Sequence, residues 1–248
     1  MNDMTHVPEQ VVTLERSLRE IFGARLRSFV VYGLHASLAT ASHPHDHQDR
    51  RAPVRTMALA ESLTRDHLRR CADRIERWHA QGLATPLLLA VHELARSLDA
   101  FPLEFGSILA DYSVVSGANP FDGLRLNPED VRRACEVQAR SHLLHLREGF
   151  LETQHNGDAL AVLIVRSAAP FAGLLAGIAR LQGLSAGDAA AAGRHAERAL
   201  QLPPGVVTDI VKLAHVTEIS SAEAVRVFPA YLDATERLVA YVDGWSAR

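Results

Sequence analysis

The sequence has few cysteines and no marked excess of charge of either sign. Cys71 and Cys135 are the two cysteines in 248 residues, and both lie in segments with amphipathic helical spacing, which argues against a disulfide-bonded secreted scaffold. We expect both to be reduced, buried thiols. The 26 basic and 29 acidic side chains give a net charge of −3, too little to attract nucleic acid or an anionic membrane. We therefore expect neither as a partner.

Signals for export, membrane insertion and several enzyme classes are also missing. The first residues, MNDMTHVPEQ, hold no basic stretch followed by an apolar run, so we expect no signal peptide and a cytoplasmic location. The long apolar run at 159–181 contains Arg166 and Pro170 and is built largely from Ala and Gly, which favours the central helix of a soluble bundle over a membrane span. No P-loop, GxGxxG, HExxH or paired CxxC pattern occurs, so those enzyme classes lose their usual signature.

The composition present is that of a folded protein with two domains. Hydrophobic residues make up 48% and charged residues 22% of the chain, close to globular averages. Residues that break regular structure crowd into one short segment, where we place the boundary between domains at 1–120 and 121–248. These are Gly117, Asn119, Pro120, Gly123, Asn127 and Pro128.

Strand and helix patterns alternate in the front half and give way to helices alone in the back half. In the front half we expect helices at 8–22, 64–81 and 92–98 and strands at 26–32, 54–60, 86–91 and 112–115, with 101–111 either helix or strand. In the back half we expect helices at 128–153, 158–181, 186–200, 204–214 and 221–244. The predicted fold is α+β, a small mixed β-sheet domain followed by an all-α helical bundle.

The opening segments carry a family resemblance. A helix ending in IFG, followed by LRSFVVYG up to Gly33, resembles the start of the DNA-polymerase-β-like nucleotidyltransferases. The order of elements over 8–120 is similar to the small antibiotic-modifying members, and FPLEF from Phe101 is similar to a segment in uncharacterised members. The resemblance implies two Mg²⁺ ions held by three carboxylates, two of them in an Asp-x-Asp pair on the strand after the glycine turn.

The sequence departs from this pattern at the metal site. The strand that should carry the acid pair reads VRTMALA, and the turn reads Gly33-Leu34. Glu104 is the counterpart of the third carboxylate, and Asp46 and Asp49 are the nearest substitutes for the pair, although an i, i+3 spacing in a polar loop does not point both at one face.

Two functions follow from this departure. The first is a degenerate, catalytically inactive binding or scaffold module that holds a nucleotide or another anionic small molecule in the cleft between the domains. The second is an active transferase with a rebuilt carboxylate site. The active form would use Mg²⁺ and transfer a nucleotidyl group to a hydroxyl of a small molecule or protein.

Two further groups of residues are candidates for binding. His43, His45 and His47 alternate in HPHDHQD. Such a pattern binds Zn²⁺ or Ni²⁺ when a loop folds around the metal. The alternative is that the three histidines lie in a solvated loop without a metal.

Arg140, His145 and Arg166 are the other group, which we expect to bind substrate together with Gly33 where the domains meet. Because Arg166 lies in an apolar helix, it needs a carboxylate or an anionic ligand; the alternative is a structural salt bridge to Glu148 or Glu152. The Ala-rich and all-apolar helices are also compatible with a homodimer through the bundle.

Overall fold

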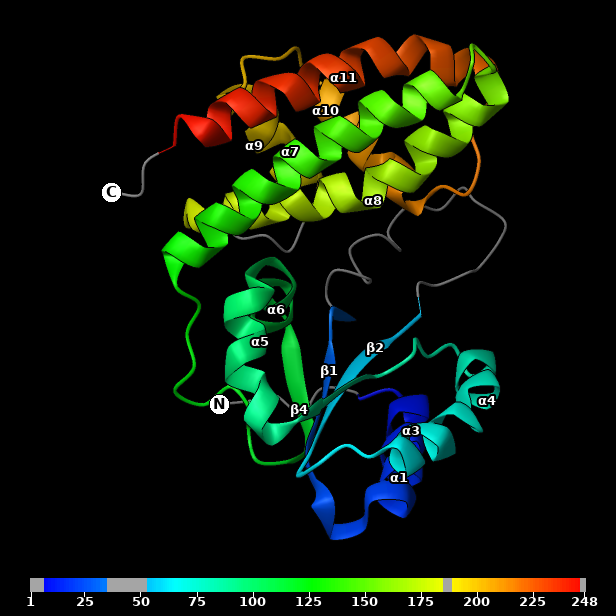
Figure 1. Cartoon of the computed structure of the whole chain (residues 1–248), viewed down its shortest axis with the longest axis vertical. Helices are drawn as coiled ribbons and strands as arrows, with labels where there is room; N and C mark the ends of the chain where they lie inside the picture. The colour runs from blue at the N-terminus through cyan, green and yellow to red at the C-terminus, as the bar shows by residue number, and fades with distance from the viewer. Residues whose placement is uncertain (1–6, 35–52, 185–188, 246–248) are drawn as a thin grey trace. The chain divides into compact units, whose positions relative to one another are not determined.

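The computed structural model describes residues 7–34, 53–184 and 189–245, and its contacts divide the chain into two units (Figure 1). Unit 1 lies within Met1–Ala100 and Ser107–Arg125, and unit 2 within Phe101–Gly106 and Leu126–Arg248. We predicted one boundary at residue 120. In the structure, the short segment Phe101–Gly106 belongs to unit 2 together with its helices. This association joins segments distant in sequence, and no local sequence pattern predicts it.

Unit 1 is built on a four-stranded mixed sheet in the order β3-β2-β1-β4. The central strand β1 runs antiparallel to both β2 and β4, while β2 and β3 are parallel. The strands are β1 (Leu26–Tyr32), β2 (Arg55–Ala60), β3 (Leu87–Ala90) and β4 (Tyr112–Gly117). This confirms the predicted α+β class with a small mixed sheet.

Short helices cover the sheet of unit 1 on its two faces, with α1, α3 and α4 on one side and α5 on the other (Figure 1). Phe29, Val31 and Ala58 point to the α1 side and share a buried core with the apolar stripe of α1. The helical segments are α1 (Glu9–Phe22), η1 (Gly23–Arg25), α3 (Arg65–Ala72), α4 (Ile75–Ala80), η2 (Val91–Glu93), α5 (Leu94–Ala100) and α6 (Pro102–Ala110).

The helix predicted at 64–81 is in fact two helices, α3 and α4, with a break after Ala72. The break places two arginines against the C-terminal end of α1. Arg70 donates to the carbonyls of Ile21 and Glu20 at 2.9 and 2.8 Å, and Arg74 donates to that of Ser17 at 3.2 Å. The carbonyls of Glu20 and Ile21 lie in the last turn of α1 and lack intrahelical partners, so Arg70 supplies donors that this helix end needs. The amphipathic pattern over 64–81 did not reveal the break.

Unit 2 consists of helices, as the back half of the sequence predicts, together with the first half of α6. Each long helix starts at a residue whose side chain caps it: Asn127 for α7, Asn156 for α8 and Ser220 for α11. The elements are α7 (Pro128–Glu152), α8 (Gly157–Leu181), α9 (Ala189–Ala199), α10 (Val206–Lys212), η3 (Leu213–His215) and α11 (Ser221–Asp243).

The apolar helix α8 is the centre of unit 2 and contacts α7, α9, α10 and α11. By length and composition it could cross a membrane, but 39% of its most apolar window is buried in the fold, and the core helix of a soluble protein passes the same test. The helix continues through Pro170 as one element, and Pro170 itself is exposed.

A buried carboxylate ties α9 to the start of α10. Glu197 is 5% exposed, and its Oε1 accepts hydrogen bonds from the backbone N–H groups of Gly205, Val207 and Thr208 at 3.1, 2.9 and 2.8 Å and from the Thr208 hydroxyl at 2.8 Å. These are the donors that the first turn of a helix leaves without intrahelical partners. The carboxylate therefore orders the 200–205 connection from inside the bundle.

Replacing Glu197 with Ala should lower the free energy of unfolding by about 2–4 kcal/mol, because several buried N–H groups lose their acceptor. Chemical denaturation with circular dichroism measures the change. Glu218→Ala, at an exposed glutamate, is the control and should change stability by less than about 0.5 kcal/mol. Equal stability of the two variants would contradict this account of Glu197.

Candidate functional site

The glycine at the end of β1 is held in a conformation and a space that suit glycine alone. Gly33 has φ +72°, and a Cβ built on it would lie 2.5 Å from Nη2 of Arg55. Its backbone N–H donates to the carbonyl of Asp111 at 2.8 Å, which extends the pairing of β1 with β4 by one residue. The family resemblance implies a glycine turn directly after this strand.

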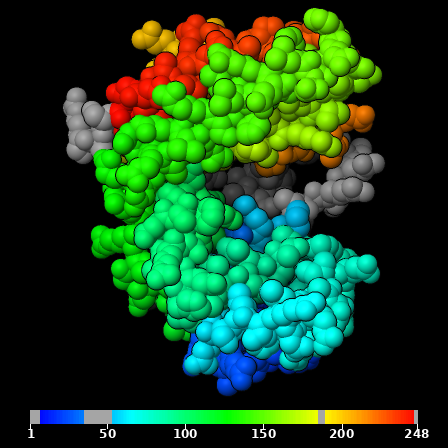
Figure 2. Space-filling model, in the orientation of Figure 1, coloured from blue at the N-terminus to red at the C-terminus, as the bar shows by residue number. Residues whose placement is uncertain are grey.

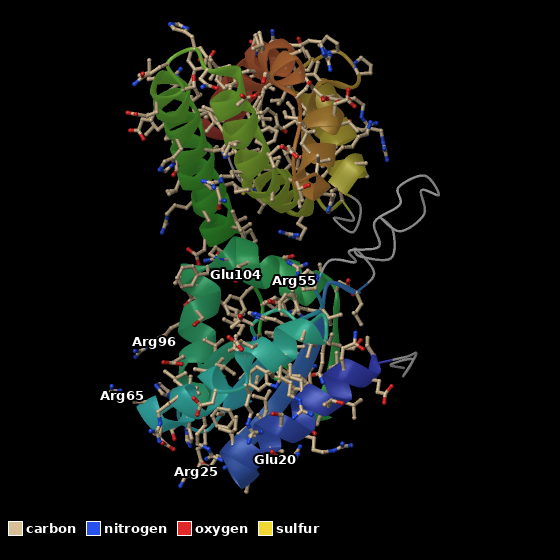
Figure 3. The ribbon with its side chains drawn as sticks, turned by 90° about the vertical axis from the view of Figure 1, so that its right-hand side faces the viewer. Glu20, Arg25, Arg55, Arg65, Arg96 and Glu104 are labelled. Atoms are coloured by element: carbon tan, nitrogen blue, oxygen red, sulfur yellow. The ribbon has the colours of Figure 1, made fainter. Side chains whose placement is uncertain are left out.

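The side chain that occupies this space belongs to Arg55, the first residue of β2. Arg55 pairs with Tyr32 across the sheet, and its Cζ lies 5.2 Å from the centre of the Tyr32 ring, within the range of a cation–π contact. The residue is exposed, and among the described residues no carboxylate forms a salt bridge with it. Figure 3 shows it at the end of the sheet opposite to Glu20 and Arg25.

Asp111 brings a carboxylate-bearing residue to the same end of the sheet. It directly precedes β4, whose first residue Tyr112 pairs with Tyr32, and it is half-buried. Sequence patterns alone did not single out Arg55 or Asp111. The available signal for Asp111 was an acid just before a short β-rich run.

The carboxylates and histidines predicted from the sequence do not form a metal site in the described part of the chain. Glu104 is exposed on α6 and so lies on a helix, not on a strand beside β1. His43, His45, Asp46, His47 and Asp49 lie outside the described residues. Within residues 7–34, 53–184 and 189–245, no group of three His, Cys, Asp or Glu side chains could hold a metal ion.

Each predicted substrate-binding residue of the helical domain has its own surroundings in unit 2. Arg140 forms a salt bridge with Asp243 of α11 at 2.8 Å, and His145 contacts the Ser141 carbonyl one turn earlier in α7 at 2.7 Å. Arg166 is exposed, which corrects our expectation of a costly buried charge. The reason is that the outer face of α8 carries small apolar residues such as Ala159 and Ala169, so an apolar sequence did not mean a fully buried helix.

Unit 2 instead buries a histidine–tyrosine pair between α7 and α11. Nε2 of His142 lies 2.8 Å from the Tyr231 hydroxyl, and the His142 ring stacks on Phe171 with centroids 5.2 Å apart. Burial lowers the pKa of His142 from its ordinary value to about 4, with a smaller effect from the neighbouring His145. The pair is a satisfied polar contact within the core, and it keeps His142 neutral at physiological pH.

The two cysteines are buried, as the sequence predicts. Burial raises the pKa of the Cys135 thiol to about 12 and also raises the pKa of Cys71. Since the thiolate is the reactive form, neither thiol is arranged as a nucleophile.

The depressed pKa of His142 predicts a loss of stability in acid. The unfolded chain binds a proton near pH 6.5 while the folded chain resists it down to about pH 4, so stability is complete above about pH 6.5 and falls as the pH drops towards 4, by about 2–4 kcal/mol in total. Denaturation curves across this range test it. His142→Gln should flatten the dependence, whereas His92→Gln, at an exposed histidine, should keep it; equal slopes in both variants would refute the assignment.

Comparison with protein-family models and with curated proteins finds no match to this chain.

Proposed function

We propose that unit 1 is a nucleotidyltransferase-like binding module that holds the phosphate of a nucleotide, or another anionic small molecule, at the end of β1 without metal-dependent transfer. One observation carries the proposal. Arg55 begins the strand on which the resembling enzymes hold their acid pair, and it is exposed with no carboxylate partner among the described residues.

The chemistry of arginine supports an anionic ligand at this position. A guanidinium group presents several N–H donors in a fixed plane and binds phosphate or carboxylate through two of them at once. The ring of Tyr32 at 5.2 Å and the missing side chain at Gly33 keep the Arg55 guanidinium close to the strand end. A positive charge here opposes the binding of Mg²⁺ and favours the binding of an anion.

The alternative function is an active Mg²⁺-dependent nucleotidyltransferase, and the position of Asp111 favours it. The backbone carbonyl of this residue accepts the Gly33 N–H, so an acidic residue lies next to the glycine turn. A two-metal site would need further carboxylates, for which Asp46, Asp49 and Glu104 remain the predicted candidates. The positively charged side chain of Arg55 would then contact the triphosphate.

The cellular location and the ligand contacts of the helical domain are also proposals. The packing of α8 within unit 2 is that of a soluble domain, and we propose a cytoplasmic location. A ligand held between the two units, with Arg140, His145 and Arg166 as contacts, stays a prediction.

A thermal-shift screen of the four nucleoside triphosphates, each with and without Mg²⁺, tests the proposal. Binding at one hundred times Kd adds about 2.7 kcal/mol to stability, so the melting temperature should rise by several degrees, with or without the metal. The rise should disappear in Arg55→Gln and persist in Arg25→Gln, an exposed arginine at the other end of the sheet (Figure 3).

The other outcomes separate the two functions. A rise that requires Mg²⁺ and is lost in Asp111→Asn or Glu104→Ala would overturn the inactive module in favour of the transferase. No rise with any triphosphate, or an equal loss in both arginine variants, would overturn the binding proposal at this site.

A further inference from the structure

Three aliphatic side chains form an exposed stripe along α7. Val137, Leu144 and Leu151 are 64%, 56% and 74% exposed, which is unusual for three large apolar residues on one helix. They are seven residues apart and therefore lie on one face. Figure 2 shows this helix as a green band at the surface of unit 2, between α11 (red) and α8 (yellow-green).

A row of arginines runs beside this stripe on the side of α11. Arg133, Arg140 and Arg147 also repeat every seven residues, and each pairs with an acid of its own chain. The N···O distances are 3.9 Å to Asp130, 2.8 Å to Asp243 and 2.7 Å to Glu236. The arginine side chains nevertheless stay 51–69% exposed, so they remain open to a second acidic partner.

The opposite side of the stripe carries a different set of residues with the same repeat. Gln138, His145 and Glu152 lie there, and Ala134, Ser141 and Glu148 lie next to the stripe itself. In the heptad notation abcdefg, the three aliphatic residues occupy position d and the three arginines occupy position g. Ala134, Ser141 and Glu148 occupy position a, and Gln138, His145 and Glu152 occupy position e. Over 25 residues, or about 37 Å, α7 thus presents an aliphatic d row and a basic g row of a short coiled coil, with small or polar residues at a.

We propose that this face of α7 binds α7 of a second copy of the chain, with the two helices parallel about a twofold axis. The charges select the partner and its direction. In a parallel pair, g residues face e residues of the partner, so Arg147 lies opposite Glu152 of the partner subunit and next to Glu148 of the partner subunit. In an antiparallel pair g faces g, so the arginine rows of the two copies would oppose each other.

The proposed interface combines aliphatic and charged residues, and this composition limits the affinity between the two copies. Leu144 packs on its own copy at the centre, while Glu148 meets its own copy across the axis, with an Arg147 guanidinium on each side. One of the two central rows is aliphatic, while the other holds Ala134, Ser141 and Glu148, so the centre is less apolar than that of an obligate dimer interface. We therefore expect a dissociation constant on the order of 10 μM, and this dimer does not depend on the ligand proposed for unit 1.

Sedimentation velocity of the full chain from about 1 to 200 μM should show a monomer–dimer equilibrium that Leu144→Asp weakens at least tenfold. The control is Leu68→Asp, at a leucine of α3 that is 49% exposed, which should leave the equilibrium unchanged. Circular dichroism melts establish that both variants fold. A monomer throughout, or equal behaviour of the two variants, would overturn the proposal.

Cross-linking decides the direction of pairing. Val137→Cys and Leu151→Cys should each form a covalent dimer with a short bismaleimide when tested alone, because in a parallel pair each position faces itself. The native Cys71 and Cys135 are buried, and the wild-type chain should give no product. Dimers that form only when the two variants are mixed would show an antiparallel pair and refute the proposed arrangement.

Discussion

The pairing of β1 with strands on both of its edges is the interaction on which unit 1 depends. β2 and β4 satisfy the two sides of β1 with antiparallel hydrogen bonds, and the buried side chains of β1 face both layers of the unit. Antiparallel registers align Tyr32 with Arg55 on one side and with Tyr112 on the other. Three segments distant in sequence therefore bring their polar residues to one end of the sheet.

The polar residues at that end of the sheet differ from those that the family resemblance implies, and they suit a different way of binding phosphate. The enzymes that the sequence resembles neutralise a triphosphate with metal ions held by acids, whereas β2 of this chain begins with an arginine. A guanidinium binds phosphate directly and needs no metal. In the function proposed for unit 1, Arg55 therefore binds the anionic ligand without metal-dependent transfer.

Unit 2 is a largely apolar helical bundle that encloses a few polar side chains, each of which has hydrogen-bond partners within the bundle. Glu197 is surrounded by N–H donors, and His142 shares a hydrogen bond with Tyr231. Each of these groups would destabilise the bundle if it lost its partner. The outer face of α7 shows the opposite condition, since apolar side chains there remain in contact with water.

Local patterns determined the elements and the class of fold. The strand at 26–32 and the long helices of unit 2 follow from β-branched runs, helical periodicity and capping residues such as Asn127, because hydrophobic spacing and helix ends are set by residues a few positions apart. The small mixed sheet beside an all-helical region follows from the order of those elements.

The tertiary structure alone decided which residues meet. The arrangement of Arg55 over Gly33 and the approach of Asp111 to the end of β1 depend on strand pairing between segments far apart in the chain. The exposure of Arg166 and the break between α3 and α4 likewise depend on which face each helix turns to its neighbours. Composition and spacing constrain a segment, but contacts across the fold are chosen by the packing of the whole unit.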